Sequence, residues 1–326
     1  MGQGPPLWAH APPLVESSSM TPTHDEPQLR RDQSPWTTRR LLGWITEYVG
    51  SKSIDSPRLV AEMLLAHVIG CERMRLYMEV DRPASPLELT TLRALVARAA
   101  KHEPVQYLVG HAWFFGREFQ IDKRVLIPRP CTETLVQHVL QHRRAAPGHA
   151  NPIIADIGTG SGCIAISLAI HIANANVIAT DESPDAIDLA RVNAQRHGVE
   201  DRIEFRLGRD LQPLTGGSSR GEFDIICSNP PYISDAEWAE VEPNVRDFEP
   251  PAALRGGADG LNLIRILIAE AGQLLRPGGQ LVMEIAHSQR EAVLELVASA
   301  DLLTNPIVLK DHEDFWRVLI ADRPQP

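Results

Sequence analysis

The sequence predicts an α/β protein with an open, doubly wound parallel sheet, preceded by a small helical domain and a β-hairpin. Short apolar runs alternate with helical periodicity after residue 152, whereas apolar residues recur only at intervals of three and four before residue 100. The length of 326 residues also exceeds that of one typical domain. We therefore expect one large domain and one smaller domain.

The first 33 residues predict a disordered N-terminal extension. They are rich in Pro, Ser and Thr, and no basic start is followed by an apolar block, so we expect no secretory signal. A mitochondrial presequence is the less favoured alternative, because Glu16, Asp25 and Glu26 are unusual in such segments.

Residues 34–111 predict the helical domain. Ser34, Ser56 and Ser85 each precede a proline, and a capping residue before a first-turn proline is typical of a helix start. The apolar residues at helical spacing include Leu41, Leu42, Ile45, Val49, Leu59, Met63, Leu64, Val68, Leu92, Leu95 and Val96.

Residues 112–130 predict a β-hairpin linker, because strand-like alternation surrounds Gly116 and a turn is expected at Asp122 and Lys123. A helix is expected to follow from about residue 132 to residue 144. On this helix His138 and His142 are four residues apart, a spacing that suits a metal. No third ligand accompanies them, so we expect a solvated helix end and no metal site.

Residues 131–326 predict the main domain, a parallel sheet covered by helices on both faces. The expected strands are 153–157, 177–180, 203–207, 223–227, 280–285, 306–309 and 316–321. The expected helices are 162–172, 184–197, 261–275 and 289–300.

Composition argues against several classes of protein. The 32 basic and 42 acidic residues give a net charge of −10, so we expect no direct nucleic-acid binding. The four cysteines form no C-x-x-C pair, which argues against a zinc site or a disulfide framework. No segment reaches the roughly 20 apolar residues of a membrane span. We expect a cytoplasmic protein without a membrane partner, and the oligomeric state stays open.

A glycine-rich turn predicts a ligand cradle. In "ADIGTGSGCIAISLA", Asp156 ends a strand, and Gly158, Gly160 and Gly162 lie in the turn that opens a helix. Glycine accepts positive φ and lets a ligand approach without meeting a Cβ. Other nucleotide-binding folds and simple packing turns use similar loops, so the turn alone does not identify the ligand.

Two acidic residues follow the next two strands. Asp181 is placed to accept the ribose hydroxyls of a nucleoside, whereas Ser183 is the better candidate for capping the following helix. Asp210 could bond an adenine amino group while Leu211 packs on the ring, although a plain loop explains this pair equally well. All of these positions follow strands, at the edge where open α/β sheets bind ligands.

The segment "FDIICSNPPY" brings a second kind of group to the same edge. Asn229 offers a carbonyl acceptor, and Pro231 keeps Pro230 extended, so the Pro230 carbonyl can point outward beside it. Two adjacent acceptors match one planar NH₂ group, and Tyr232 adds an aromatic face for stacking.

These groups suit an amide or aromatic amine that must attack an electrophile. Such a nitrogen is a poor nucleophile because its lone pair is delocalised, and holding both of its hydrogens aims the lone pair. The electrophile implied is a sulfonium methyl, and no general base is required. A proline-rich loop that merely ends a buried strand is the structural alternative.

The chain resembles the class I methyltransferases, and most closely the HemK-type glutamine-N5 protein methyltransferases that act on peptide chain release factors. The resemblance runs from about residue 38 to residue 321. It is carried by "EPVQYLVGHAWFFGREFQIDKRVLIPRPCTETLV", "DIGTGSGCIAISLA", "SNPPYIS", "VRDFEPPAALRGGADGL" and "KDHEDFWRVLIA".

The resemblance implies S-adenosyl-L-methionine as cofactor and the glutamine of the Gly-Gly-Gln loop of release factors as substrate, with the helical domain gripping the factor. By position, the cofactor-binding residues are Gly158, Thr159, Gly160, Ser161, Gly162, Asp181, Asp210, Leu211 and Asn229. The substrate-binding residues are Asn229, Pro230, Pro231 and Tyr232, among which Asn229, Pro230 and Tyr232 are the expected catalytic residues.

The chain departs from the family pattern at Cys131, where the family usually has Glu, and at Trp316, where Asp is common. We expect neither residue to touch the methyl-transfer site. Arg129 and Arg246 are expected to tie the hairpin and the "DFEPP" loop to the rim of the site.

Three alternatives stay open. A sibling enzyme of the same chemistry methylates a glutamine of a large-subunit ribosomal protein. An adenine-N6 DNA methyltransferase would clamp a flipped base with the same four residues, although the net acidity argues against it. A cofactor-binding module without catalysis is the third.

Overall fold

The computed structural model describes residues 35–145, 149–215 and 221–325. The chain divides at Pro35, and Trp36–Pro326 forms one compact unit. The extension predicted for residues 1–33, and the predicted cap Ser34, lie outside the described residues.

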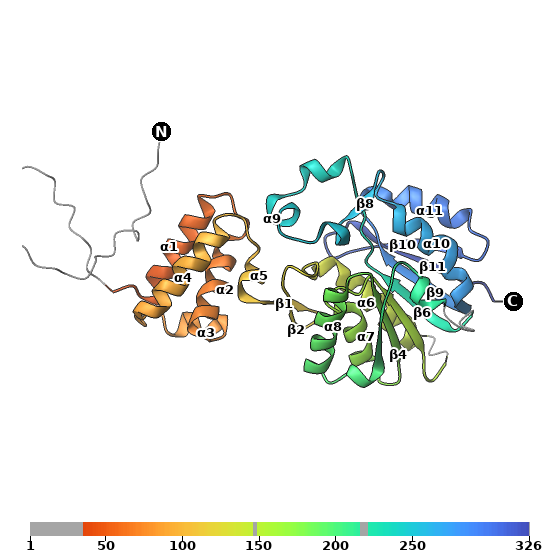
Figure 1. The fold of residues 1–326 in the computed structure, drawn as a ribbon, viewed down its shortest axis with the longest axis horizontal. Coiled ribbons are helices and arrows are strands. Elements are labelled where there is room, and N and C mark those ends of the chain that lie inside the picture. Colours follow the sequence, from red (N-terminus) through yellow and green to blue (C-terminus); the bar gives the residue numbers. More distant parts are fainter. Residues whose placement is uncertain (1–34, 146–148, 216–220, 326) are drawn as a thin grey trace, which may run out of the picture. The chain divides into compact units, whose positions relative to one another are not determined.

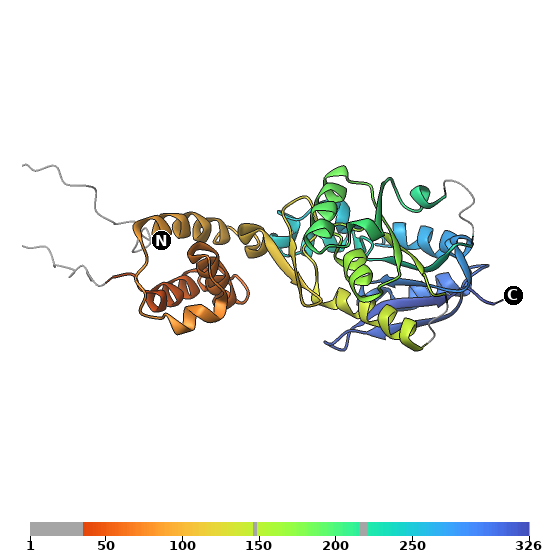
Figure 2. The ribbon, with the colours of Figure 1, turned by 90° about the horizontal axis from the view of Figure 1, so that it is seen from below.

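The compact unit begins with a bundle of helices around its own apolar core (Figures 1 and 2). Leu41, Ile45, Leu64 and Val96 are buried in it, which confirms most of the helical spacing seen in the sequence, whereas Leu59 is exposed. The helices are α1 (Thr38–Gly50), α2 (Pro57–Ile69), α3 (Arg73–Met78), α4 (Pro86–Ala99) and α5 (Val105–Val109).

The helix starts only partly follow the predicted caps. Ser85 and Glu88 form a reciprocal capping box at α4. Ser56 precedes Pro57 at the start of α2, but its side chain makes no capping bond. At α1 the cap is Thr37, whose hydroxyl accepts a hydrogen bond from the Arg40 amide. Proline thus marked the start of α2 and α4, while the capping bond depended on local backbone geometry.

The hairpin predicted around Gly116 is present and short. Strands β1 (His111–Phe114) and β2 (Arg117–Gln120) pair antiparallel across it. The predicted turn also forms, because the Val125 amide donates to the Asp122 carbonyl at 3.2 Å. No strand follows this turn, so the regular hairpin ends at Gln120.

The main sheet has seven strands in the order β10-β11-β9-β6-β3-β4-β5. The prediction of a parallel sheet is wrong for one strand, since β11 runs antiparallel to both neighbours. A short turn joins it directly to β10, and such a connection reverses the chain. The strands are β3 (Ile153–Ile157), β4 (Asn176–Asp181), β5 (Ile203–Leu207), β6 (Phe223–Ser228), β9 (Leu275–Glu284), β10 (Thr304–Lys310) and β11 (Trp316–Asp322).

Helices cover both faces of this sheet (Figure 1), and each face carries its own apolar core. Along β9, Val282 belongs to the first core, and its neighbours Leu281 and Met283 belong to the second, as the alternation of a strand requires. The first face carries α6 (Glu133–Ala145), α7 (Cys163–His171) and α8 (Pro184–Arg196); the second carries α10 (Asn262–Leu274) and α11 (Arg290–Ala298). The doubly wound architecture is therefore confirmed.

Within the described ranges, no helix combines the length and apolar character needed to cross a membrane. In the same part of the chain, His, Cys, Asp and Glu side chains form no group of three that could hold a metal. A solvated helix end was expected at His138 and His142, but His138 lies in the middle of α6. It is half-buried and shares a hydrogen bond of 3.2 Å with Gln280.

Candidate active site

A cavity of about 420 Å³ opens where the ends of four strands meet. The strand order reverses between β3 and β6, and open α/β sheets bind ligands at such a switch point. Eight of the predicted site residues line this cavity: Gly158, Thr159, Gly160, Ser161, Asp181, Asp210, Asn229 and Pro231. Gly162, Pro230, Leu211 and Tyr232 are not among its lining residues.

The glycine loop serves two purposes. Gly158 and Gly160 have φ angles of 71° and 54°, and a Cβ on either would meet no atom within 4 Å, so their backbone faces open space. A Cβ on Gly162 would instead lie 2.8 Å from Ile166 Cδ1 and 3.2 Å from Ala190 Cβ. The third glycine therefore allows α7 to pack against α8, and does not line the cavity.

Asp156 supports this loop by accepting hydrogen bonds beneath the cavity-lining backbone of the loop and at the start of α7. It is fully buried, and its Oδ2 accepts hydrogen bonds from Thr159 Oγ1 at 2.7 Å and from the Ala165 amide at 3.2 Å. Its Oδ1 has no hydrogen-bond partner among the described residues. Burial raises the pKa of Asp156 to about 7, against the effect of the two hydrogen bonds. The Asp156 carboxyl thus fixes the loop, although its burial disfavours the ionised form.

Asp181 lies at the end of β4 and faces the same loop. Its two oxygens accept hydrogen bonds from the Gly160 and Ser183 amides, each at 2.9 Å. Burial raises the pKa of Asp181, while these backbone bonds lower it. Ser183 caps α8 by accepting from the Ala186 amide, as expected, which leaves Asp181 free of that task. Each oxygen keeps a lone pair that a hydroxyl group can reach.

Asp210 and Leu211 separate in the structure. Asp210 lines the cavity in a left-handed conformation with φ of 52°. Leu211 is fully buried in the second core, so its side chain does not pack on a ligand in the cavity as the sequence analysis expected. The turn that follows β5 directs the Leu211 side chain into the core, so this side chain does not face the cavity.

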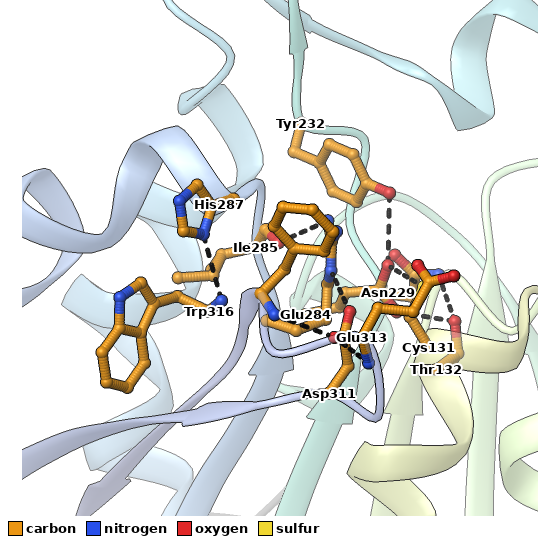
Figure 3. A network of polar contacts seen from close by, with 12 residues as sticks. Cys131, Thr132, Asn229, Tyr232, Glu284, Ile285, His287, Asp311, Glu313 and Trp316 are labelled. Atoms are coloured by element: carbon orange, nitrogen blue, oxygen red, sulfur yellow. Dashed lines mark hydrogen bonds and ion pairs between the residues drawn. The ribbon is translucent and has the colours of Figure 1, made fainter.

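Asn229 follows β6, and its orientation depends on two residues that the sequence analysis did not single out (Figure 3). Its Nδ2 donates to Thr132 Oγ1 at 3.2 Å, and Thr132 Oγ1 donates to Glu284 Oε2 at 2.6 Å. Thr132 also lines the cavity. The amide oxygen of Asn229 is therefore the group left for a ligand.

Glu284 is the centre of this network. It is fully buried, and its Oε1 accepts from Tyr232 Oη at 3.2 Å and from Cys131 Sγ at 3.5 Å (Figure 3). Burial raises the pKa of Glu284, whereas the hydrogen bond from Thr132 and the Arg317 guanidinium lower it. The sequence signal that could have revealed Glu284 is a charged residue at the end of an apolar run, in "QLVME", because a buried carboxylate needs several hydrogen-bond partners.

The Asn-Pro-Pro-Tyr backbone is held by a second glycine-rich segment. The short strands β7 (Ile233–Ser234) and β8 (Arg255–Gly257) pair beside it. A Cβ on Gly256 would lie 2.6 Å from the Pro231 carbonyl oxygen, and Gln289 Nε2 donates to the Tyr232 carbonyl at 3.0 Å. Tyr232 itself packs against the second core, and Pro230 is buried. This backbone therefore has little room to move.

The rim is fastened by one of the two predicted arginines. Arg129 lines the cavity and pairs with the buried Glu249 at 2.5 Å, and Glu249 also accepts from the Ile127 amide at 3.0 Å. This confirms the expected tie between the hairpin region and the "DFEPP" loop. Arg246 was expected to do the same, but it pairs with its neighbour Asp247.

The two departures from the family pattern differ in position. Cys131 contacts Glu284, so three hydrogen bonds, through Glu284 and Thr132, link it to Asn229, and it lies closer to the site than expected. Burial raises the pKa of the Cys131 thiol to about 12, which keeps it protonated. The Trp316 ring makes cation–π contacts with Arg290 and Lys310, whose cationic groups lie 4.6 Å and 4.9 Å from its ring centroid.

Comparison with known proteins places the chain in a family. Residues 40–110 match the PrmC N-terminal domain, and residues 149–312 match a methyltransferase domain. The release factor glutamine methyltransferase of Geobacter sulfurreducens is 44% identical over 79% of this chain and 87% of that protein. The protein of the same name from Chlorobaculum tepidum is 42% identical over 88% of this chain and 98% of its own length.

A solved structure from Alicyclobacillus acidocaldarius, described as a release factor-specific protein-(glutamine-N5) methyltransferase, is 27% identical with a TM-score of 0.37. It covers 64% of this chain and 100% of that one. The assignment rests on the curated relatives and the two matched domains. This chain belongs to the family of release factor glutamine methyltransferases.

Proposed function

We propose that the protein transfers a methyl group from S-adenosyl-L-methionine to the side-chain amide nitrogen of the glutamine in the Gly-Gly-Gln loop of peptide chain release factors. The observation that carries this proposal is the position of Asn229. Its amide is anchored through Nδ2, and it lines the same cavity as the glycine loop and Asp181.

The cavity fits the proposed cofactor. Gly158 and Gly160 leave open space where a side chain would otherwise stand, which suits the methionine part. Asp181 and Asp210 both line the cavity; the carboxylate of Asp181 suits the ribose hydroxyls, and that of Asp210 suits the adenine amino group. When bound, the cofactor supplies a methyl group made electrophilic by a positively charged sulfur.

The substrate amide would be held by acceptors. Asn229 Oδ1 and the Pro230 carbonyl accept the two hydrogens of the glutamine NH₂ group, which fixes the nitrogen in one orientation. Tyr232 supports this arrangement through the hydrogen bond from its hydroxyl to Glu284. The amide nitrogen loses its proton readily once alkylated, so no residue is assigned as a general base.

The proposal extends to the domains and the partner. Residues 34–111 form a helical substrate-recognition domain, 112–130 the hairpin linker and 131–326 the methyltransferase domain, with 1–33 as an extension. The match of residues 40–110 to the PrmC N-terminal domain supports a role of this part in gripping the release factor. The reaction would then take place in the cytoplasm, without nucleic acid or membrane as partner.

The proposal is tested by asking which substrate takes up a labelled methyl group. Purified protein is incubated with labelled cofactor and a release factor, the same factor with its loop glutamine changed to Ala, ribosomal proteins, or DNA. We expect label on the intact release factor alone. Label on ribosomal proteins or DNA, with none on the release factor, would establish one of the alternatives instead.

Asn229→Ala tests the mechanism. Removing the acceptor should lower kcat by about a hundredfold or more, the loss typical of a single positioned polar group. Binding of S-adenosylhomocysteine, measured by calorimetry, should survive. Activity close to that of the unchanged protein would show that Asn229 does not orient the amide.

A further inference from the structure

Glu284 and Thr132 determine which end of the Asn229 amide can face the cavity. The three side chains form a single line of hydrogen bonds, with Asn229 Nδ2 3.2 Å from Thr132 Oγ1 and Thr132 Oγ1 2.6 Å from Glu284 Oε2. Glu284 is fully buried and Thr132 is 2% exposed, so the contact between these two residues is shielded from water.

The direction of this line follows from counting protons. Three neighbouring donors and the Arg317 guanidinium favour the ionised form of Glu284 against the effect of burial. An ionised carboxylate can only accept, so the Thr132 hydroxyl gives its single proton to Glu284. The Thr132 hydroxyl can then only accept a hydrogen bond from Asn229. The Asn229 amide must therefore turn its NH₂ group, its donor end, toward Thr132. The carbonyl end is consequently turned away from Thr132.

The other oxygen of Glu284 strengthens this direction. Tyr232 and Cys131 approach Oε1 at 3.2 Å and 3.5 Å, and both are donors because burial raises the pKa of each above its usual range. The Arg317 guanidinium adds favourable positive charge near the carboxylate. The observed partners of Glu284 thus all favour its role as an acceptor.

We propose that Glu284, acting through Thr132, is a positioning residue that sets the polarity of the site: it keeps Asn229 Oδ1 available as an acceptor for the substrate NH₂ group. The inference rests on the proposed function. It gives Glu284 and Thr132 the role of selecting a substrate group that donates hydrogen bonds. Glu284 does this without contacting the substrate.

Glu284→Gln tests this with almost no change of shape. The new NH₂ group can donate to Thr132, whose hydroxyl is then free to donate to Asn229. The Asn229 amide would turn over and present NH₂ to the substrate NH₂, which places two donors face to face. We expect kcat on the release factor to fall about a hundredfold, with S-adenosylhomocysteine affinity within threefold of the unchanged protein.

A second substitution should reverse the effect. In Glu284→Gln combined with Asn229→Asp, the side chain of residue 229 has only acceptor atoms. An acceptor therefore faces the cavity in whichever direction the hydrogen bonds from residue 284 through Thr132 to residue 229 point. We expect kcat at least tenfold above that of Glu284→Gln alone. A merely structural loss at Glu284 would not be repaired by this change.

Thr132 provides matched variants. Thr132→Ser keeps the hydroxyl and should retain kcat within about threefold, whereas Thr132→Val removes it at similar volume and should lower kcat at least tenfold. Circular dichroism and S-adenosylhomocysteine binding check that each variant is folded.

The possible outcomes separate the two proposals. Failure of the unchanged protein to methylate the release factor would refute the proposed function itself. An active unchanged protein together with an active Glu284→Gln variant would refute the polarity proposal alone. Absence of rescue in the folded, cofactor-binding double variant would also refute it.

Discussion

Asp156 illustrates how a single residue supports the site at a cost to stability. It braces the glycine loop through Thr159 and the first turn of α7, yet one of its oxygens is buried without a partner in the described part of the chain. A carboxyl in such surroundings is easier to protonate than in water. The same residue that shapes the cavity therefore makes the protein sensitive to pH.

This sensitivity can be predicted with its sign. The pKa of Asp156 is raised by burial to about 7 in the folded protein, from 3.8 for an unperturbed carboxyl. Between these values the folded state binds the proton more tightly, so the stability contribution falls as pH rises and is constant above about pH 7. The fall is at most about 4 kcal/mol.

Urea unfolding at pH 4.5, 6 and 7.5 measures the effect. The free energy of unfolding of Asp156→Asn, which cannot ionise, should rise relative to the unchanged protein across this range. Asp188→Asn, on the exposed side of α8, serves as the control and should follow the unchanged protein. A constant difference between Asp156→Asn and the unchanged protein would contradict the assignment.

At the scale of elements, the site depends on how loops are packed over the strand ends. The segment containing β8 lies against the Asn-Pro-Pro-Tyr backbone, with Gly256 close to the Pro231 carbonyl. On the other side of the cavity, the buried Asn193 of α8 donates to Ser161 and to Gln120 at 2.9 Å each. Each loop is held by an element that comes from a distant part of the sequence.

Gly256→Ala is predicted to displace the Asn-Pro-Pro-Tyr loop. The added Cβ would lie 2.5 Å from the Gly260 carbonyl oxygen and 2.6 Å from the Pro231 carbonyl oxygen, and backbone must move to make room. We expect a loss of about 1–3 kcal/mol in the free energy of unfolding and at least a tenfold loss in kcat.

Gly43→Ala is the matched control for this substitution. Gly43 lies inside α1, and a Cβ there meets no atom within 4 Å. Alanine should stabilise this helix by up to about 1 kcal/mol without changing kcat. Equal activity of both variants would show that the loop tolerates displacement.

At the scale of the whole molecule, the chain builds separate apolar cores. The helices before residue 110 enclose one core, and the main sheet is covered by two others. The cavity is lined by residues from 124 onward, so the core of the helical bundle contributes nothing directly to it. Damage to the helical bundle should therefore affect use of the protein substrate more than cofactor binding.

Leu64→Ala and Leu267→Ala test this separation. Both leucines are fully buried, Leu64 in the helical bundle and Leu267 in the second core, and each truncation should cost about 2–5 kcal/mol. We expect Leu64→Ala to raise the KM for the release factor while S-adenosylhomocysteine affinity is unchanged. Weakened cofactor binding in Leu64→Ala, measured by calorimetry, would mean that the bundle and the sheet unfold together.

Much of the fold could be predicted because its signals are local. The alternation of strands and helices after residue 152 reflects the periods of 2 and 3.6. These periods located the helices and most strands of the main sheet to within a few residues, although β9 begins at Leu275, five residues before its predicted start. The strand direction of β11 could not be predicted this way, because apolar alternation looks the same in both orientations. Its reversal depends on the short connection from β10.

By itself, the sequence determined the elements, the glycine turn and the Asn-Pro-Pro-Tyr segment, since each depends on residues that are neighbours along the chain. Only the tertiary structure decided that Thr132 and Glu284, 152 positions apart, meet beside Asn229, and that Leu211 turns into the core. The physical reason is that hydrogen bonding and burial depend on distance in space, and the packing of the sheet sets those distances only once the chain has folded.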